Sequence, residues 1–305
     1  MKVCLGYNSG PHTGKGFFRE MLEEALVKQN IEITSPKDKS DIDLQFGKLA
    51  YKPNAKKRIL RLGPAHINSA QDIKKLNAPK WKAAKSSHGI IYQSEFSKKV
   101  CHKFIGRPKG LETVILNGAN KTRRALDGGT NILASTRKWI PQKRLKYIIQ
   151  AFEKLLEMGT EANLFILGDI QNNEKVKHNR IFYSGLKDHE SLNEIYFVSD
   201  MMVHIVYLDA CPNSVAEALM SGIPVVCTDQ GGTKELVRDR GIIIPDEPYD
   251  FKVTNLEKPP KVDTDKLALA MNECLKIKRV SAPDLDINVV AKQYIDFFEK
   301  VLCQK

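Results

Sequence analysis

Asp209 and Glu217 are two acidic residues beside a predicted helix start. Their types and their spacing suit binding or catalysis. They are separated by seven residues in the stretch DACPNSVAEALMSG. Asn213 or Ser214 is a good N-cap for the helix, and Gly222 is expected to end it. The N–H groups of the first helical turn, at the positive end of the helix dipole, can bind an anion. This stretch therefore predicts a site for a negatively charged ligand.

The two acids suit a ligand that also carries hydroxyl groups. A carboxylate at Glu217, close to the helix start, can accept hydrogen bonds from two neighbouring hydroxyls, and a ribose supplies such a pair. Asp209 lies in the loop that leaves the apolar stretch 201–207. Taken singly, Glu217 reads as an acid that complements the helix dipole, and Asp209 as a plain loop acid. Their combination favours a functional site.

The elements that must position these residues are strands alternating with helices along the whole chain. This alternation predicts an α/β fold with two doubly wound, Rossmann-like domains facing each other across an interdomain cleft. In such sheets, ligands bind at the carboxyl ends of the strands, where the strand order reverses. The polar segment 121–130 is the expected linker. Strands are predicted at 2–8, 31–35, 41–47, 57–63, 89–94, 113–118, 131–136, 162–168, 180–185, 201–207 and 223–228. Helices are predicted at 17–29, 95–105, 143–158, 189–199, 214–222, 264–278 and 287–302.

The positive charge of the chain is confined to its first part. Residues 1–128 contain 25 Lys and Arg against 11 Asp and Glu, a net charge of +14, whereas residues 129–305 contain 23 against 25, a net charge of −2. A solvated lysine-rich surface explains such a charge run. An anionic partner explains it equally well: a lipid phosphate at a membrane surface, an acidic glycan or, less favoured, a nucleic acid.

The composition also bears on the compartment. The six cysteines have no CxxC spacing and are expected to be reduced and buried, as in a cytoplasmic protein. No apolar run approaches the roughly 20 residues of a transmembrane segment, and the N-terminus does not have the pattern of a signal peptide. We therefore expect a cytoplasmic protein, or one bound peripherally at the inner membrane surface.

The pattern Asp209-x7-Glu217, with PNSVAEALMSGIPVV and a following GG-x-x-Glu, resembles the nucleotide-sugar signature of family 4 (group 1) retaining glycosyltransferases, which have the GT-B fold. NILASTRKWIPQKRLKYIIQAFEKL, LFILGD and VILNGAN are similar to further segments of that family. The resemblance implies a basic, acceptor-side Rossmann-like domain at 1–126. It also implies a donor-binding domain at 127–284 and a helix, 285–305, that crosses back to the first domain.

The resemblance assigns the donor contacts. Glu217 holds the ribose hydroxyls and Asp209 contacts the transferred sugar, although the family more often has Glu at the latter position. Lys143 binds the diphosphate together with Arg137 or Lys138. The basic pair of the family is usually five residues apart, and the alternatives here are six and five residues from Lys143, so both remain candidates. Backbone amides near Asn213, Ser214 and Val215 complete the anion site, and Gly168 and Leu186 border the base pocket.

The chemistry of transfer supports these roles. A departing nucleoside diphosphate gains negative charge, and fixed cations and helix-start amides stabilise that charge. Such a site needs no metal, and the sequence has no His/Cys cluster of ligand spacing. We expect no metal and no cofactor, with the nucleotide-diphosphate sugar as co-substrate. On its own, the basic stretch RKWIPQKR reads as a solvated loop.

The first domain offers weaker candidates. Gly14, Lys15 and Gly16 form a glycine-rich loop after the first strand, and the resemblance places this loop near donor or acceptor. A simple strand-to-helix turn is the alternative, and the spacing does not match a nucleotide P-loop. His66 follows the fourth strand, where family members often carry a histidine near the sugar, and His12 is a weaker candidate.

The predicted function is a retaining, metal-independent glycosyltransferase of the hexosyltransferase type (EC 2.4). It would move a sugar from a nucleotide-diphosphate donor to a glycan, a lipid-linked acceptor or another acceptor. A nucleotide-sugar epimerase of the same fold is one alternative. A DNA-associated glycosyltransferase that acts on modified bases is another. The epimerase requires acid and base residues at the sugar, and the sequence shows no clear set.

Overall fold

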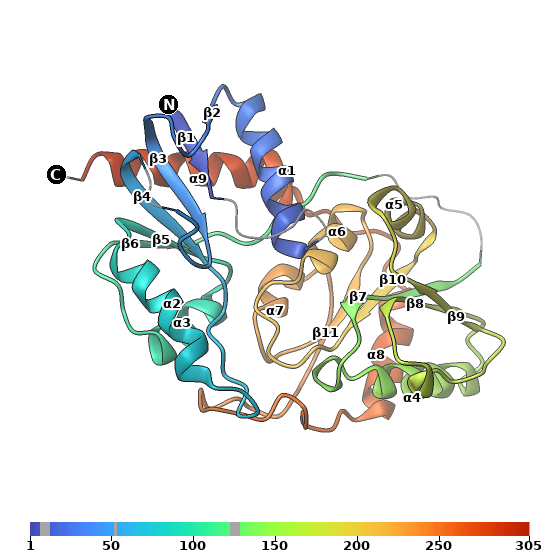
Figure 1. Cartoon of the computed structure of the whole chain (residues 1–305). Helices are drawn as coiled ribbons and strands as arrows, with labels where there is room; N and C mark the ends of the chain where they lie inside the picture. Colours follow the sequence, from blue (N-terminus) through green and yellow to red (C-terminus); the bar gives the residue numbers. More distant parts are fainter. Residues whose placement is uncertain (7–12, 52–53, 123–128, 305) are drawn as a thin grey trace. The chain divides into compact units, whose positions relative to one another are not determined.

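The chain forms two compact units, described by a computed structural model over residues 1–6, 13–51, 54–122 and 129–304 (Figure 1). Unit 1 comprises Met1–Asn120, Phe251–Thr254 and Pro283–Lys305, and unit 2 comprises Lys121–Asp250 and Asn255–Ala282. The predicted boundary at 126/127 and most of the predicted linker lie outside the described residues.

Unit 1 is built on a six-stranded parallel sheet with the order β2-β1-β3-β4-β5-β6. The direction of strand addition reverses between β1 and β3, as in flavodoxin-like sheets. Two of the strands, β3 and β5, are almost wholly buried because helices cover both faces of the sheet. The strands are β1 (Lys2–Leu5), β2 (Glu32–Thr34), β3 (Ser40–Phe46), β4 (Ala55–Leu62), β5 (Gly89–Tyr92) and β6 (Leu111–Val114).

Helices cover both faces of this sheet. α1 (Gly14–Lys28) and α9 (Ile287–Leu302) pack against each other on one face, and α2 (Ile73–Lys85) and α3 (Glu95–Phe104) cover the other (Figure 1). A short 3-10 turn, η3 (Pro283–Leu285), precedes α9. The predicted cap of α3 is confirmed, since the Ser94 hydroxyl accepts a hydrogen bond from the Ser97 N–H at 3.0 Å.

The core of unit 1 joins segments from opposite parts of the chain. Phe298 of α9 is fully buried with side chains of the sheet and α1. Arg61, at the end of β4, is also buried, and its Nε donates to the Tyr294 hydroxyl of α9 at 3.0 Å. The Arg61 guanidinium lies 4.1 Å from the ring centroid of Phe18 of α1. The helix α9 is therefore an integral part of unit 1.

Unit 2 contains a second six-stranded parallel sheet, with the order β12-β11-β10-β7-β8-β9. Strand addition reverses between β7 and β10, which is the arrangement of a Rossmann sheet. Both central strands are buried through most of their length. The strands are β7 (Asn131–Lys138), β8 (Asn163–Asp169), β9 (Ile181–Gly185), β10 (Met201–His204), β11 (Val225–Thr228) and β12 (Gly241–Ile244).

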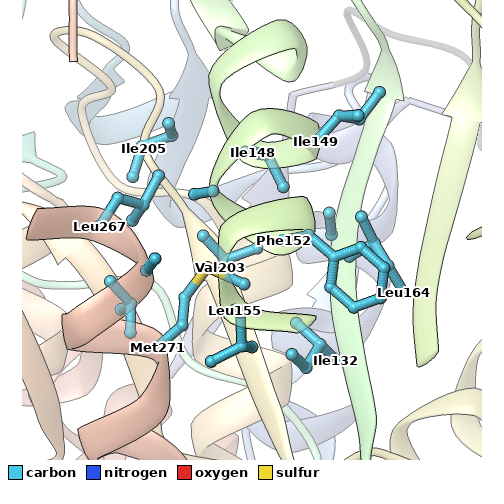
Figure 2. Packing of buried hydrophobic residues seen from close by; sticks show 14 of the residues in the cluster. Ile132, Ile148, Ile149, Phe152, Leu155, Leu164, Val203, Ile205, Leu267 and Met271 are labelled. Atoms are coloured by element: carbon cyan, nitrogen blue, oxygen red, sulfur yellow. The ribbon is translucent and has the colours of Figure 1, made fainter. Parts of the chain in front are cut away.

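The helices of unit 2 enclose a well-packed core. Figure 2 shows Phe152 of α4 beside Leu164 of β8, and Leu155 of α4 between Ile132 of β7 and Met271 of α8. α4 and α8 share this face of the sheet, and α6 packs with α7 on β10 and β11. The elements are α4 (Leu145–Glu157), α5 (His189–Val198), α6 (Asn213–Met220), α7 (Thr233–Val237), α8 (Thr264–Leu275), η1 (Pro141–Lys143) and η2 (Asn172–Glu174).

The six cysteines are all free, and five of them are buried. Cys303 is exposed, so the expectation that all six are buried is wrong at this position. It follows the last turn of α9, where the packed face of the helix has ended. Within the described ranges, none of the helices combines the length and the apolar character needed to cross a bilayer.

Candidate active site

The candidate site in unit 2 lies at the carboxyl ends of β7 and β10. These strands are neighbours in the sheet, with Met201 opposite Ile132. The loop after β7 carries Lys143, and the loop after β10 carries Asp209 and leads into α6. Strand order reverses here, so the two loops diverge and leave room for a ligand at the sheet edge.

The start of α6 exposes backbone N–H groups rather than a side-chain cap. The cap position is Pro212, which has no capping hydrogen bond, so the prediction of Asn213 or Ser214 as N-cap is wrong. The N–H of Ala216 is the one that bonds back to Pro212 O, at 3.3 Å. The amides of Asn213, Ser214 and Val215 thus form the first turn, where N–H groups have no acceptor within the helix. An anion site at these amides is geometrically possible.

The predicted helix end is confirmed. Gly222 has a φ of 83°, and its N–H donates to Leu219 O at 3.0 Å. The next amide, Ile223, donates to Ala218 O at 2.9 Å. This pair of bonds is a Schellman motif, which favours glycine at the left-handed position. The helix is therefore short, and Glu217 lies in its middle.

The Glu217 carboxylate is held by a residue that the sequence analysis missed. The Tyr196 hydroxyl of α5 donates to Glu217 Oε2 at 2.8 Å. Tyr196 is buried, whereas Glu217 keeps part of its surface accessible. Burial raises the pKa of Glu217, and the hydrogen bond from Tyr196 opposes this rise. The hydrogen bond at Oε2 thus orients the Glu217 carboxylate, and the remaining lone pairs of the carboxylate can accept further hydrogen bonds.

Asp209 is paired with a buried histidine. His204 Nε2 lies 3.2 Å from Asp209 Oδ2, and the two side chains are 4% and 29% exposed. Burial opposes ionisation of Asp209, but the hydrogen bond from His204 and the charges of His204 and Lys143 hold the pKa of Asp209 below its usual value. Asp209 is therefore an anion at neutral pH, and its position is fixed by a partner at the end of β10.

The glycine pair that follows in the sequence supports the backbone of Asp209. Gly231 has a φ of 101°, and a Cβ there would lie 2.7 Å from Asp209 O. The Gly232 N–H donates to the same oxygen at 2.7 Å. A side chain at Gly231 would thus displace the Asp209 backbone. This close approach explains the glycine at position 231.

Lys143 is held at the end of the turn η1. Its Nζ donates to Thr136 Oγ1 of β7. Burial lowers the pKa of Lys143, while the charge of Asp209 acts in the opposite direction. Arg137 and Lys138 are both exposed at the end of β7, where the register with β8 shifts. The structure thus brings Lys143 to Asp209 and leaves both candidates for the second cation exposed.

A buried ion pair connects the basic loop to the segment after β12. Arg144 has a φ of 61°, and its guanidinium bonds to Asp246 at 2.5 and 3.0 Å. The two side chains are 0% and 1% exposed. Arg144 Nη1 also donates to Ile205 O at 3.4 Å, and the guanidinium lies 4.8 Å from the Tyr207 ring centroid. Arg144 therefore fixes the loop that carries Lys143.

The two residues predicted to border the base pocket differ in environment. Gly168 is buried at the end of β8 with a φ of 114°, and a Cβ there would lie 1.8 Å from Thr136 O. The close approach of β7 and β8 thus requires glycine at this position. Leu186 follows β9 and is a large apolar side chain that is well exposed. It therefore has surface available for a planar ligand.

The predicted glycine loop of unit 1 is wrong in part, because Gly14, Lys15 and Gly16 form the first turn of α1. The Thr13 hydroxyl caps this turn by accepting from the Gly16 N–H at 3.1 Å. Lys15 Nζ lies 3.1 Å from the place that a Cβ on Gly47 would take. Burial and the charges of Arg61 and Lys48 lower the pKa of Lys15. The three residues are thus placed at the carboxyl end of the sheet of unit 1.

His66 lies in the loop after β4 and is tied to α2 through its backbone. Its N–H donates to Asn77 Oδ1 at 2.8 Å, and its carbonyl accepts from Asn77 Nδ2 at 2.9 Å. Burial and the charges of Lys80 and Lys15 lower the pKa of His66, so its imidazole is neutral at physiological pH. His12 lies outside the described residues.

The residues that the sequence analysis missed are partners of those it found. His204 is a polar residue at the end of an apolar strand, and that position was a signal that could have been used. Tyr196 gave no signal, because its helix is separated from Glu217 by β10. Three further residues were missed: Thr136, Arg144 and Asp246.

Comparison with known proteins places the chain in a family. The family model described as "Glycosyl transferases group 1" matches residues 118–276, more than half of the chain. No curated protein sequence matches the chain. The described structure is similar to sucrose-phosphate synthase (tll1590) from Thermosynechococcus elongatus, with a TM-score of 0.72 and 13% identity over 98% of each chain.

Other solved structures show the same fold. Anabaena Alr3699/HepE in complex with UDP-glucose has a TM-score of 0.70 and 14% identity, over 98% of this chain and 100% of that one. AviGT4, a glycosyltransferase involved in avilamycin A biosynthesis, has a TM-score of 0.62 and 14% identity, over 100% and 98%. The two parallel sheets and these likenesses define the GT-B fold. The chain belongs to the glycosyl transferases group 1 family and is a glycosyltransferase of the hexosyltransferase type (EC 2.4).

Proposed function

We propose that this enzyme transfers a sugar, with retention and without a metal, from a nucleotide-diphosphate donor to its acceptor. The observation that carries this proposal is the grouping of three features at one sheet edge of unit 2. They are the Glu217 carboxylate held by Tyr196, the Lys143 ammonium beside Asp209, and the N-terminal turn of α6. The Anabaena protein binds UDP-glucose, which makes UDP-sugars the first donors to test.

Each part of this group matches one part of the donor. Glu217 accepts hydrogen bonds from the two ribose hydroxyls. Lys143 and the amides of Asn213, Ser214 and Val215 face the diphosphate, with Arg137 or Lys138 as a second cation. Because Lys143 is partly desolvated, its charge acts more strongly there than in water. The grouping thus stabilises the charge that the leaving diphosphate gains.

The sugar is transferred by exchange of one bond for another. The bond between the anomeric carbon and the diphosphate oxygen breaks, and a bond from the acceptor oxygen forms on the same face. The departing phosphate takes the proton of the acceptor hydroxyl, so that no separate general base is required. Asp209, an anion held by His204, contacts the transferred sugar. The Asp209 side chain is shorter than the Glu that the family more often has, and its length sets the distance from the carboxylate to the sugar.

In this proposal the acceptor binds to unit 1, and Lys15 and the neutral His66 are candidate contacts for it. The net charge of +14 on residues 1–128 favours an acceptor with an anionic group, such as a lipid phosphate or an acidic glycan. A cytoplasmic enzyme that binds the inner membrane surface peripherally fits such an acceptor. No cofactor takes part.

Replacing Glu217 by Gln tests the donor site. We expect UDP-sugar to bind at least about tenfold more weakly to Glu217→Gln, because charge-assisted hydrogen bonds to the ribose are lost. The fold should persist, since Gln can still accept from Tyr196. Burial raises the pKa of Glu217 in the folded state, so its ionisation lowers stability as pH rises through this range. The variant should therefore have an equal or higher Tm at pH 7. The measurements are the Tm and its shift on adding UDP-sugar.

Glu194→Gln is the matched control, because Glu194 is an exposed acid on the helix that carries Tyr196. It should keep the full shift in Tm on adding donor. Equal donor shifts in both variants would contradict the ribose assignment. Transfer that stops in EDTA and returns with a divalent cation would contradict metal independence. Interconversion of the nucleotide sugar without any acceptor would favour an epimerase.

A further inference from the structure

The outer faces of α2 and α3 in unit 1 carry positive charge almost without acidic residues. From residue 73 to residue 111 the chain contains ten Lys and Arg but a single acid, Glu95. Six of the lysines are exposed on the two helices, and we call them, with Trp81 and Leu76, the α2–α3 surface. These lysines are Lys74, Lys75, Lys82, Lys85, Lys99 and Lys103.

The two helices form one continuous surface. They cover the same face of the sheet (Figure 1). The ring of Trp81 of α2 lies 3.1 Å from the place that a Cβ on Gly106 would take, just after α3 ends. Gly106 has a φ of 101°, so the turn that brings the end of α3 under Trp81 favours glycine. The lysines of both helices therefore share a surface around Trp81.

The lysines of the α2–α3 surface lie in a part of the chain that has few acidic residues. Some exposed lysines elsewhere in the described residues pair with carboxylates, as Lys56 does with Asp41 and Lys276 with Glu273. None of the six lysines of the α2–α3 surface takes part in an ion pair with a described residue. Their uncompensated charge favours a polyanionic partner.

Exposed apolar side chains among these lysines indicate the kind of polyanion. Trp81 and Leu76 are 39% and 38% exposed on the two flanks of α2. Tryptophan is enriched at membrane interfaces, where its ring lies at the level of the headgroups. The positive side chains are also lysines on both helices, whereas planar, bidentate recognition of nucleic-acid phosphates and bases favours arginine. Lysines around an interfacial aromatic suit an anionic lipid surface.

We propose that the α2–α3 surface docks this enzyme onto anionic membranes, with the lysines over the headgroups and Trp81 inserted at the interface. The surface belongs wholly to unit 1 and involves no donor-site residue. The proposal therefore stands or fails independently of the donor assignment. It requires no conformational change, because the side chains are already exposed.

Vesicle binding tests this proposal with the full-length protein. We expect sedimentation with vesicles of phosphatidylcholine containing about a third phosphatidylglycerol, and none with phosphatidylcholine alone. Binding should fall as salt is raised. Lys82→Glu with Lys103→Glu should weaken binding by roughly 25-fold or more, because each lysine near an anionic surface contributes about fivefold. Equal binding to both kinds of vesicle, or no binding to either, would overturn the proposal.

A control variant separates the local effect from the change in net charge. Lys177→Glu with Lys258→Glu changes two exposed lysines of unit 2 by the same charge. This variant should bind anionic vesicles nearly as well as the unchanged protein. If it loses as much affinity as the variant of the α2–α3 surface, the attraction is a property of the whole molecule and the assigned surface is wrong.

Tryptophan fluorescence distinguishes a membrane from a nucleic acid. The chain has two tryptophans, and Trp139 is buried and bonded to Leu167 O. Vesicles should shift the emission to the blue, and lipids with brominated acyl chains should quench it. Trp81→Phe should abolish both effects while most of the salt-dependent binding remains. Absence of quenching, together with binding to duplex DNA at least as tight as to vesicles, would assign the surface to nucleic acid instead.

Discussion

Gly231 determines where the Asp209 carboxylate can lie, although it has no side chain of its own. Its backbone lies against Leu208 and Asp209, and a φ of 101° is strained for other residues. The Asp209 side chain is also held by His204, at the end of β10. The acid is thus positioned from both its backbone and its carboxylate, which reduces the reorganisation needed when a sugar binds.

Gly231→Ala should therefore lower activity by more than backbone strain at a positive φ would alone, because it also displaces Asp209. The new Cβ would lie 2.7 Å from Asp209 O, so the loop must move. We expect the free energy of unfolding to fall by about 1–3 kcal/mol. We also expect kcat/KM to fall by about a hundredfold, because a displacement of about 1 Å can have that effect. Chemical denaturation and initial rates of transfer measure the two effects.

Gly159→Ala is the matched control for this prediction. Gly159 also has a positive φ, 86°, but nothing lies within 4 Å of the place its Cβ would take. It should lose about 1 kcal/mol of stability and retain its activity. If both variants retain activity, Asp209 does not depend on Gly231 for its position.

At the level of single residues, only part of the site could be predicted from the sequence. Asp209, Glu217 and Lys143 stand out because their types and local spacing match a pattern. Of their partners, Tyr196 lies on α5, before β10, and meets Glu217 only in the folded unit, whereas His204 is five residues from Asp209 and was open to prediction. The N-cap assignment at Asn213 or Ser214 failed by one residue because proline also occupies cap positions, where its ring cannot accept a hydrogen bond.

At the scale of elements, the buried pair Arg144–Asp246 holds the basic loop to the loops at the end of the sheet. Asp246→Ala should lower the free energy of unfolding by about 3–5 kcal/mol, because it leaves the Arg144 guanidinium buried without a counter-charge. Urea denaturation followed by the fluorescence of buried Trp139 reports the change, since this residue belongs to the core of unit 2.

An exposed pair in the same unit provides the comparison. Lys154 and Asp265 are 34% and 76% exposed, and Asp265→Ala should change the free energy of unfolding by less than about 1 kcal/mol. Similar losses in Asp246→Ala and Asp265→Ala would mean that the Arg144 loop is not held by its ion pair.

Elements were predictable where their periodicity was strong. The amphipathic helices α4 and α9 and most apolar strands were found close to their observed bounds, whereas the strand predicted at 113–118 overlaps β6 only at its end. The helix α2 was missed because it contains Pro79 and half of its exposed residues are lysines. The strand β12 and the helix α7 were missed because each has only four or five residues, too few to show a period.

At the scale of the whole molecule, α/β alternation was enough to predict two doubly wound sheets, and the GT-B fold is confirmed. The strand orders themselves were not predicted, because alternation alone does not say which strands become neighbours. The return of the chain to unit 1 through Phe251–Thr254 was also missed. That short segment bonds to the loop after β4, where Thr254 N–H donates to Ile67 O at 2.9 Å.

Phe298→Ala should destabilise unit 1 selectively. Phe298 is fully buried in the core of unit 1 and meets Tyr294 edge-on at 6.1 Å. We expect a loss of about 3–5 kcal/mol in the free energy of unfolding of unit 1. Limited proteolysis followed by mass spectrometry should show new cleavage sites in residues 1–120, with residues 129–250 still protected.

Phe152→Ala is the reciprocal variant, because Phe152 lies at the centre of the core of unit 2 (Figure 2). New cleavage should then appear in residues 129–250 and spare unit 1. If either variant opens both units to the same extent, they unfold as one cooperative body rather than as two.

The contribution of α9 to unit 1 has a consequence for how the protein is made. The first six strands leave the ribosome long before Ile287–Leu302 are translated, so the face later covered by α9 stays open while unit 2 is synthesised. Unit 2 has all its strands by residue 244 and can close first. The unit that is translated first is thus completed last, and its uncovered apolar face is open to aggregation for the longest time.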